Sequence, residues 1–371
     1  MSTANTTTLK PQRNRGVLRD GLFIKSAPSY YSPSQASQWL DCIGFPQKFD
    51  VASFPSTLEN LAHLVRLHLV AFPFENTAMH YTPHHTMDVT HEGAFRRLVL
   101  EHKGSYCFGQ NGVFLGMLRA LGYRAYSGAA RVNSTPESLQ PSFTSLSHMV
   151  IFVQPIQDSN ETYVVDVGFG STGLARPILL SDANDNVVMG TWSTEKHRLT
   201  RSPHPSSSLE ISEARSTDTN FLWNLEVLHC KEENIDTPWK LLFSFTEDEY
   251  YPVDYENASF VLTHKPEGIF WTNVLCIRYV PLSEAGSIDA ETKAQIDLDL
   301  AQRPAESSKD FLFKYVMRGL EVKRSIGSSS VVIRTLTSEA ERIRALREIF
   351  NLDIPDAAET HMEGRGAAFL S

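Results

Sequence analysis

Three residues of this 371-residue sequence have the side-chain types that together transfer acyl groups: Cys107, His148 and Asp166. A cysteine thiolate attacks carbonyl carbon, and a histidine next to it can serve as its base. A buried carboxylate fixes the tautomer of such a histidine and stabilises its charged form. Taken together, the three residues predict an activated nucleophile that carries an acyl group as a thioester.

Cys107 lies in the glycine-flanked segment Gly104-Ser-Tyr-Cys-Phe-Gly-Gln-Asn111, which we expect to lead directly into a helix. The free N–H groups and the positive dipole end of a helix N-terminus favour thiolate, so the pKa should fall below the usual value of about 8.5. The alternative is a small buried apolar residue, as most free cysteines are. That alternative is preferred for Cys42, Cys230 and Cys276, which lie inside apolar periodic segments.

His148 and Asp166 each adjoin a short apolar segment that is rich in β-branched residues, 149–153 and 163–167. Such segments are typical of buried strands. If the polar residues 158–160 connect them as a hairpin, His148 and Asp166 become neighbours. A carboxylate in this setting is costly to bury unless it is paired. The alternatives are a hydrogen-bonded structural histidine and an aspartate that caps the backbone N–H groups of the glycines after it.

The first third of the chain, from about Pro33 to Leu121, has helical periodicity. Ser56 to Glu59 has the pattern of a capping box. The helix after it should bury one face at the spacing i, i+3, i+4, i+7, formed by Leu58, Leu61, Ala62, Val65 and Leu69. A second helix should run from near Cys107 through Leu118, with Gly122 as the left-handed residue after its end.

The remaining two thirds of the chain are predicted to be mainly strands, with further strands at 221–229 and 239–245. The polar residues 181–220 are long enough to indicate a mobile insertion. A last unit should contain strands at 269–280 and 330–336 and then a helix that Ser338 caps and Pro355 ends. The buried face of that helix is expected to be Ile343, Leu346 and Phe350.

Composition excludes several classes of protein. The net charge is −9 and the pI about 5.8, which argues against binding to nucleic acid. No run of 18 apolar residues predicts a membrane-spanning helix, and the N-terminus lacks the apolar region of a secretory signal. Four cysteines without a C-x-x-C pair fit a reducing compartment, so we expect a cytoplasmic protein. No metal site is expected, because His80, His84 and His85 lack the context of metal ligands.

Five features make the sequence resemble the arylamine N-acetyltransferases. Phe72-Pro-Phe-Glu-Asn76 is similar to the P-F-E-N element of that family, and Lys103 to Asn111 is similar to its R-G-G-x-C-x-E-x-N nucleophile segment. His148 precedes an apolar strand as the family's base does, and Val165 to Gly170 resembles its D-x-G-F-G. Ser259 to Gly268 resembles the segment that opens the third domain. The long 181–220 segment and the extended N-terminus make the chain more similar to fungal members than to bacterial ones.

The resemblance implies an α+β fold with the three-domain arrangement of the cysteine proteinases. The expected units are a flexible tail (1–30), a helical bundle with the nucleophile (31–125), a β-barrel (126–256) that carries the polar insertion at 181–220, and an α/β lid (257–371). The substrate cleft would lie between the barrel and the lid.

The activity implied by the resemblance is a ping-pong transfer from acetyl-CoA, or another short acyl-CoA, to an arylamine or hydrazine, as in xenobiotic detoxification. Cys107 would receive the acyl group, His148 would act as base, Asp166 would orient and charge the imidazole, and Phe169 would line the acceptor pocket. No metal is implied, and acetyl, propionyl and malonyl donors all remain open. The alternative is a papain-like or transglutaminase-like thiol hydrolase, because it uses the same three residues in the same order.

Three positions near the nucleophile depart from the family pattern: Lys103, Ser105 and Gly109 stand where the family has Arg, Gly and Glu. In the family the Arg pairs with the Glu of P-F-E-N, which is Glu75 here. We therefore expect a Lys103–Glu75 pair that is less rigid, because lysine lacks the bidentate guanidinium. A non-enzymatic member of the fold is the second alternative that these departures leave open.

Overall fold

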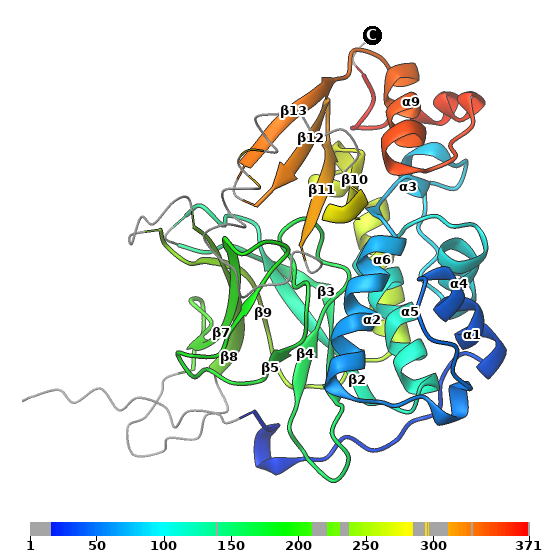
Figure 1. Ribbon diagram of the computed structural model, residues 1–371. Helices are drawn as coiled ribbons and strands as arrows, with labels where there is room; N and C mark the ends of the chain where they lie inside the picture. The colour runs from blue at the N-terminus through cyan, green and yellow to red at the C-terminus, as the bar shows by residue number, and fades with distance from the viewer. Residues whose placement is uncertain are drawn as a thin grey trace, which may run out of the picture.

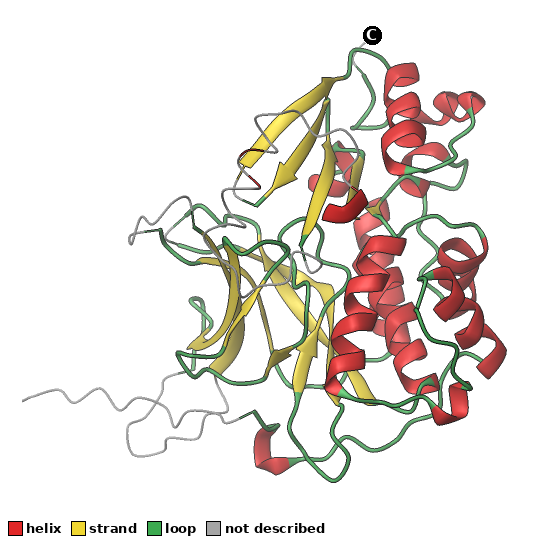
Figure 2. Cartoon of the chain, in the orientation of Figure 1, coloured by secondary structure: helices red, strands yellow, loops and turns green. Residues whose placement is uncertain are grey.

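The structure is a computed structural model that describes residues 16–138, 140–209, 221–230, 237–284, 294, 296, 311–327 and 329–369. Helices α1 to α6 gather on one side of the molecule, and a strongly curved eight-stranded sheet lies beside them (Figure 1, Figure 2). A second, five-stranded sheet and the C-terminal helix α9 lie above both. The predicted α+β class is confirmed, while the predicted domain boundaries remain a prediction.

The N-terminal helices surround α5, which carries Cys107 at its first residue. They are α1 (Pro33–Cys42), α2 (Leu58–Ala71), α3 (Ala78–Tyr81), α4 (His91–Phe95), the π-helical turn η3 (Arg96–Leu100) and α5 (Cys107–Ala120). Nearly every residue of α5 is buried, as expected for a helix packed on all sides. It ends as predicted: Gly122 has a φ of +85°, and the N–H of Tyr123 donates to the carbonyl of Leu118.

The start of α2 differs from the prediction by one residue. Thr57 is the N-cap, and its hydroxyl accepts from the N–H of Asn60, so the predicted Ser56–Glu59 capping box is wrong. The buried face of the helix also includes two residues that the prediction did not contain. That face consists of Leu61, Leu64, Val65, His68 and Leu69, whereas the predicted Leu58 and Ala62 are only partly buried.

The eight-stranded sheet is antiparallel throughout and has the strand order β5-β4-β3-β2-β9-β8-β7-β6. Its strands are β2 (Arg124–Asn133), β3 (Phe143–Gln154), β4 (Tyr163–Val165), β5 (Ile178–Leu179), β6 (Val187–Met189), β7 (Glu195–Pro203), β8 (Phe221–His229) and β9 (Lys240–Phe245). Met149 and Ile151 of β3 pack against the helices, while Val150 and Phe152 between them point into the core of the barrel-like sheet. This alternation explains why β3 is apolar on both faces.

The prediction that residues 181–220 form a mobile insertion is wrong for the first part of this range. Strands β6 and β7 lie within it, and β7 pairs with β8 along its whole length, from Glu195 opposite His229 to Pro203 opposite Phe221. Residues 210–220 lie outside the described residues. The sequence of β7 alternates buried and partly buried side chains, but the buried ones include Glu195 and His197, so hydrophobicity does not reveal the strand.

The five-stranded sheet has the order β1-β10-β11-β12-β13, and β1 comes from the N-terminal helical part of the chain. Its strands are β1 (Phe74–Glu75), β10 (Leu275–Pro281), β11 (Leu312–Arg318), β12 (Glu321–Ile326) and β13 (Ser329–Thr335). Three further helices are α6 (Pro252–His264), which packs against β3 and α5, α7 (Ile269–Thr272), and α9 (Glu339–Phe350), which packs against β10. Short 3-10 turns complete the described chain at Arg19–Gly21, Val51–Ser53, Leu282–Glu284 and Asp356–Met362.

Two predicted boundaries in this last unit are wrong. The expected strand at 269–280 begins as helix α7, and β10 starts only at Leu275. Ser338 caps α9 as predicted, with its hydroxyl accepting from the N–H of Glu341. The helix ends at Phe350 with Asn351 in the left-handed region, and therefore before Pro355. Asparagine tolerates this conformation, so it ends the helix in place of the predicted proline.

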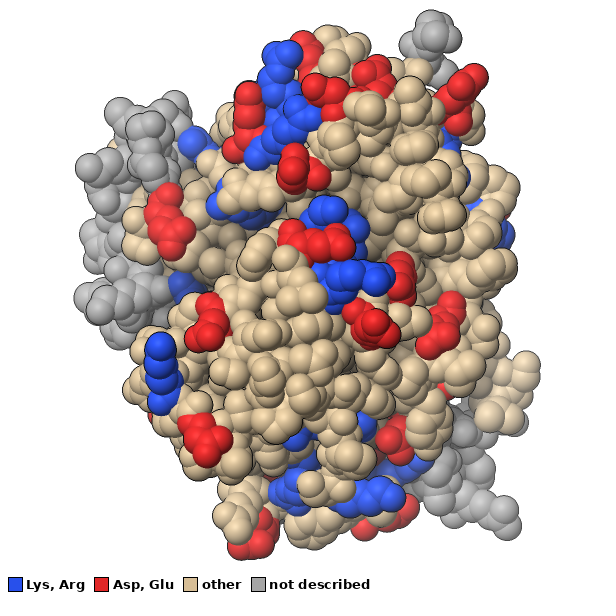
Figure 3. Space-filling model, turned by 90° about the vertical axis from the view of Figure 1, so that its right-hand side faces the viewer, with Lys and Arg blue, Asp and Glu red and all other residues tan. Residues whose placement is uncertain are grey.

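The face of the molecule on the helical side carries acidic and basic side chains that are interspersed with one another (Figure 3). Such mixing is typical of a surface in contact with water. Among the described helices, none combines the length and the apolarity that crossing a membrane requires.

Candidate active site

Cys107 lies where the N-terminus of α5 meets the β3 strand. The preceding residue, Tyr106, has an extended backbone and provides no side-chain cap. Its hydroxyl is held instead by the hydroxyl of Ser259 in α6. The thiol of Cys107 is buried, and its Sγ lies 3.7 Å from the carbonyl oxygen of Ser147. The sulfur therefore sits at the positive end of the α5 dipole, directly beside the residue that precedes His148.

His148 and Asp166 are joined by a buried hydrogen bond, with 2.7 Å between Nε2 and Oδ2. The hairpin that the sequence predicted brings them together, because β3 and β4 pair in antiparallel register with Ile151 opposite Val165. The other oxygen of Asp166 accepts from the N–H of Gly168 at 2.8 Å. One carboxylate is therefore hydrogen-bonded both to the imidazole and to the backbone N–H of the following turn.

Asn111 is a site residue that the sequence interpretation missed. Its Nδ2 donates to Asp166 Oδ1 at 2.9 Å and to the carbonyl of Met149 at 2.8 Å, and its Oδ1 accepts from the N–H of Val167. Because Asn111 follows Cys107 by four residues in α5, both lie on one face of the helix. That spacing was the available signal. The amide thus fixes the position of Asp166 relative to the nucleophile.

His148 is charged near neutral pH. Burial opposes the charge, but the charge and the hydrogen bond of Asp166, with a further contribution from Cys107, raise the pKa of His148 to about 10. Nε2 then donates to the carboxylate, and Nδ1 is the ring nitrogen left for other partners. The imidazolium places a positive charge in the surroundings of the Cys107 sulfur.

Phe169 forms an apolar wall beside the imidazole. Its half-buried ring meets His148 edge to face, with 5.1 Å between the ring centroids, and packs against Phe243 of β9 at 5.0 Å. All four residues singled out from the sequence, Cys107, His148, Asp166 and Phe169, therefore lie close together. Their chemical roles remain predictions.

The loop after Phe169 is held from the five-stranded sheet and from β7. Tyr279 of β10 donates to the carbonyl of Gly170, and Lys314 of β11 donates to the carbonyl of the next residue, Ser171. From β7, His197 contacts the carbonyl of Thr172 through Nε2 at 2.9 Å. Three successive carbonyls thus have buried partners from two sheets.

A buried ion pair supports this loop. Lys314 Nζ lies 2.9 Å from Glu195 Oε2, and both side chains are almost completely buried. Burial raises the pKa of Glu195, but the charges of Lys314 and His197 and the backbone N–H of Thr191 outweigh it and lower the pKa to about 2. The carboxylate is therefore ionised at any physiological pH.

Lys314→Met is expected to destabilise the fold by about 3 kcal/mol at pH 7, because it leaves the Glu195 carboxylate buried without its ammonium partner. The depressed pKa of Glu195 means that the pair stabilises the protein fully above about pH 4.5 and that this contribution is lost as the pH falls toward 2. The loss of stability that Lys314→Met causes should therefore become smaller as the pH falls. Urea unfolding across this range measures it.

The matched control for this prediction is Lys323→Met, since Lys323 pairs with Glu321 on β12 and both side chains are exposed. An exposed pair is worth roughly 0–1 kcal/mol. A loss of stability in Lys314→Met no larger than in the control would contradict the assigned role of the buried pair.

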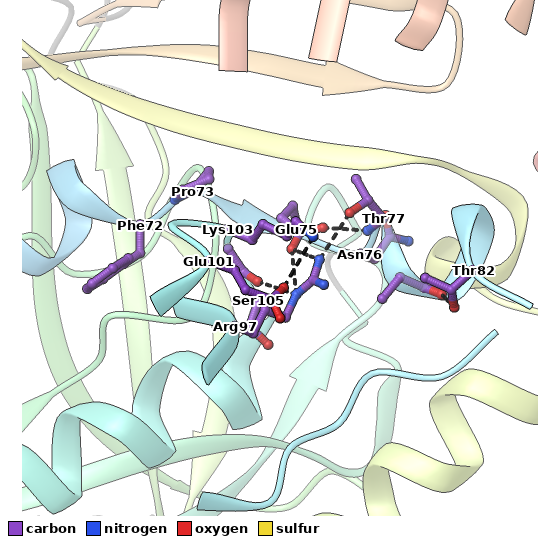
Figure 4. A network of polar contacts seen from close by, with 12 residues as sticks. Phe72, Pro73, Glu75, Asn76, Thr77, Thr82, Arg97, Glu101, Lys103 and Ser105 are labelled. Carbon is purple, nitrogen blue, oxygen red and sulfur yellow. Dashed lines mark hydrogen bonds and ion pairs between the residues drawn. The ribbon is translucent and has the colours of Figure 1, made fainter. Parts of the chain in front are cut away.

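The expected Lys103–Glu75 pair is wrong. Glu75 is completely buried and is paired instead with Arg97, whose Nη2 lies 2.5 Å from Glu75 Oε1 (Figure 4). Lys103 pairs with Glu101 at 3.2 Å near the surface. The family pattern places the guanidinium four residues before the nucleophile, whereas here it comes from the turn after α4, η3.

The other two departures compensate for each other. A Cβ added to Gly109 would lie 2.2 Å from the hydroxyl oxygen of Ser105. The serine side chain therefore fills the space next to Gly109, and a larger side chain at position 109 would collide with it. Ser105 and Gly109 form one local change in packing, and the His148–Asp166 hydrogen bond involves neither of them.

A cavity of about 470 Å³ lies between the barrel-like sheet and the five-stranded sheet. It begins at Ser171, two residues after Phe169, and basic side chains of both sheets line it. They are Lys240, Lys314, Arg318 and Lys323, together with the acidic Glu195 and Glu321. Three of these lysines have carboxylate partners: Lys314 pairs with Glu195, Lys323 with Glu321 and Lys240 with Glu137. Within the described part of the chain, no three His, Cys, Asp or Glu side chains are grouped so that they could hold a metal ion.

The chain resembles known acyltransferases over most of its length. A sequence model of an N-acetyltransferase family matches residues 57–286. The chain is 28% identical over 355 residues to an N-malonyltransferase, FDB2, of Gibberella moniliformis, which covers 90% of this chain and 92% of that protein. It is 29% identical over 226 residues to the arylamine N-acetyltransferase of Escherichia coli, covering 60% and 67%.

Solved structures show the same fold. The arylamine N-acetyltransferase of Mycobacterium marinum in complex with CoA superimposes with a TM-score of 0.62 at 20% identity, covering 90% of this chain and all of that chain. The enzyme of Mycobacterium abscessus gives a TM-score of 0.63 at 22% identity, covering 88% and 93%. Because the family match spans more than half of the sequence, the protein belongs to the arylamine N-acetyltransferase family and is an acyltransferase.

Proposed function

We propose that the protein transfers a short acyl group from coenzyme A to the nitrogen of an arylamine or hydrazine, with Cys107 as the acyl carrier. The observation that supports this most directly is the buried His148–Asp166 hydrogen bond of 2.7 Å beside the N-terminus of α5. It supplies a charged imidazolium next to a thiol at the positive end of a helix, the combination that activates a cysteine nucleophile.

The proposed reaction has two halves. In the first, Cys107 Sγ attacks the thioester carbon of acyl-CoA, the bond from that carbon to the CoA sulfur breaks, and His148 protonates the departing CoA thiolate. In the second, the amine nitrogen attacks the acyl-cysteine, His148 takes the proton from nitrogen, and Cys107 leaves as thiolate. Asp166 stabilises the imidazolium that exists before the first half and that the second half restores, whereas between the two halves the imidazole is neutral.

We further propose that malonyl-CoA is a better donor than acetyl-CoA. The relatives that match nearly the whole chain are N-malonyltransferases, whereas the acetyltransferase of Escherichia coli matches 60% of it. The cavity next to Ser171 adds a physical argument, because the guanidinium of Arg318 in its lining can bind a carboxylate or phosphate of the donor.

The acyl-enzyme itself tests the proposal. Incubation with malonyl-CoA or acetyl-CoA in the absence of amine should add one acyl group to the protein, located on Cys107 by peptide mapping and absent from Cys107→Ala. The malonyl adduct should form faster. Addition of an arylamine should discharge the adduct into the N-acyl product.

Two outcomes would contradict the proposal. One is that neither donor leaves an adduct or releases free CoA. The other is that the adduct decays to the free acid equally fast with and without amine, which would indicate a thiol hydrolase. Cys276→Ala serves as a control, since this buried cysteine lies in β10 and should leave adduct formation unchanged.

A further inference from the structure

The side chain of Arg97 connects three segments around the nucleophile (Figure 4). Its Nε donates to the carbonyl of Gly104 at 2.7 Å, and its Nη2 donates to Glu75 Oε1 at 2.5 Å and to the Thr77 hydroxyl at 3.1 Å. The Arg97 side chain is only 13% exposed. A planar group with donors in fixed directions holds partners on two sides at once, which an ammonium cannot do with the same geometry.

The partners of Arg97 belong to the elements that locate Cys107. Gly104 lies three residues before the nucleophile, in the turn that leads into α5. Glu75 lies in β1, where its backbone N–H donates to the carbonyl of Ser105 at 3.1 Å and its residue pairs with Cys276 of β10. Arg97 therefore fastens the turn before the nucleophile to the edge of the five-stranded sheet.

This turn has little room to move. A Cβ on Gly104 would lie 1.9 Å from the carbonyl oxygen of Pro73, so the glycine backbone lies directly against the chain that enters β1. On the other side, Gln110 of α5 donates to the same Pro73 carbonyl at 2.8 Å. The start of α5 is thus held by Gln110 after the nucleophile and by Arg97 before it.

Removal of the guanidinium would have two separable effects. Glu75 would be left as a buried carboxylate without the ion pair that the described structure gives it, which costs stability. The carbonyl of Gly104 would lose its donor, and the turn before Cys107 could shift. Only the second effect changes where the sulfur lies relative to His148.

We propose that Arg97 is a positioning residue that sets the place of Cys107 against His148 through the Gly104 carbonyl. Arg97 contacts none of the proposed reacting atoms, so it acts through the backbone of the turn. The inference rests on the proposed role of Cys107 as nucleophile, and it assigns to a residue of the π-helical turn η3 the control of that nucleophile.

The test separates positioning from stability. Arg97→Gln removes both contacts, whereas the double variant Glu75→Gln/Arg97→Gln also removes the unpaired buried charge and should therefore recover most of the lost stability. In both variants the second-order rate of Cys107 alkylation by iodoacetamide at pH 7, located by peptide mapping, should fall about tenfold or more. The single-turnover rate of acylation by acyl-CoA should fall by roughly 10- to 100-fold, because small displacements of a reacting group are costly.

Three further variants complete the design. Arg97→Lys keeps the charge but cannot hold Gly104 and Glu75 together, so its rates should lie between those of Arg97→Gln and the wild type. Glu75→Gln keeps an amide oxygen that can accept from Arg97 and leaves the contact between Arg97 and Gly104, so it should alkylate nearly as fast as the wild type. Lys103→Gln, which removes a nearby surface cation, should stay within about twofold of the wild type.

If the folded double variant is alkylated and acylated as fast as the wild type, the proposal is overturned, because Arg97 would then contribute to stability alone. An equal loss of rate in Lys103→Gln would overturn it as well. The loss of any nearby positive charge would then explain the slower reaction, without a specific contact from Arg97 to Gly104. Alkylation needs no acyl donor. If the wild type forms no acyl-enzyme, the proposed function fails, while the alkylation rates still decide whether Arg97 positions Cys107.

Discussion

Asp166→Asn is expected to lower kcat/KM by about 10³-fold or more while Cys107 stays in place. The carboxylate receives the Nε2 hydrogen of His148 at 2.7 Å and provides the charge that keeps the imidazole protonated. An amide is nearly the same size and can accept from Asn111 or Gly168, so the fold should persist. It carries no charge, and the imidazole therefore loses the partner that makes it an imidazolium.

The pH dependence of stability gives a second measurement on this variant. The pKa of His148 is raised to about 10 in the folded protein, above the value of about 6.5 in an unfolded chain. A raised pKa contributes stability that is complete below pH 6.5 and is lost as the pH rises toward 10. The wild type should therefore lose stability over this interval, and Asp166→Asn should lose much less.

Asp158→Asn is the matched control, because Asp158 is an exposed turn residue between β3 and β4 whose φ of +58° asparagine tolerates. It should keep both the turnover and the pH dependence of the wild type. Near-normal turnover by Asp166→Asn, with unfolding curves that follow those of the wild type from pH 6.5 to about 10, would refute the role assigned to Asp166.

Gly168→Ala is expected to have the second large effect. A Cβ at this position would lie 2.7 Å from the Cα of Cys107 and 2.9 Å from Asn111 Nδ2. Both neighbours lie within the first five residues of α5, which is packed on all sides and cannot retreat. The added methyl group should therefore push the Asp166 turn away from α5, with a loss of about 1–3 kcal/mol in stability and roughly 100-fold in kcat/KM.

Gly112→Ala supplies the comparison for this prediction. Gly112 lies in α5, the helix that Gly168 approaches, and a Cβ on Gly112 would meet nothing within 4 Å. Alanine in a helix interior is better than glycine by roughly 0.5–1 kcal/mol, so this variant should be slightly stabilised and fully active. Thermal unfolding and steady-state kinetics distinguish the two. Equal behaviour of the two variants would mean that the close approach of Gly168 to Cys107 does not matter.

The triad could be predicted from the sequence because short-range patterns position it. Two β-branched segments with a polar connection between them form the β3–β4 hairpin, and that hairpin brings His148 to Asp166. The helix after Cys107 could be predicted from its apolar periodicity and from Gly122 at its end. Hairpin pairing and helix termination depend on residues close in sequence, so the signals are local.

Strand β7 could not be predicted, because it hides polar side chains where a strand is expected to hide apolar ones. Glu195 and His197 point inward and are buried, the first against Lys314 and the second against the carbonyl of Thr172. These partners lie more than a hundred residues and about twenty-five residues away in the chain. The sequence of this polar segment therefore resembles that of an insertion, because the distant residues that pair with its buried polar side chains cannot be recognised from the segment itself.

The partner of Glu75 could not be predicted for the same reason, because it is also set by the packing of separate segments. The sequence by itself determined that His148 and Asp166 are neighbours, and it predicted Cys107 as the nucleophile and the elements that carry the three residues. The family resemblance also implied that a cation pairs with Glu75, and Lys103 was the candidate by position. Only the tertiary structure decided that Arg97 fills this place. A buried carboxylate needs a partner within hydrogen-bond distance, and which cation comes that close depends on how separate segments pack, which no local pattern in the sequence encodes.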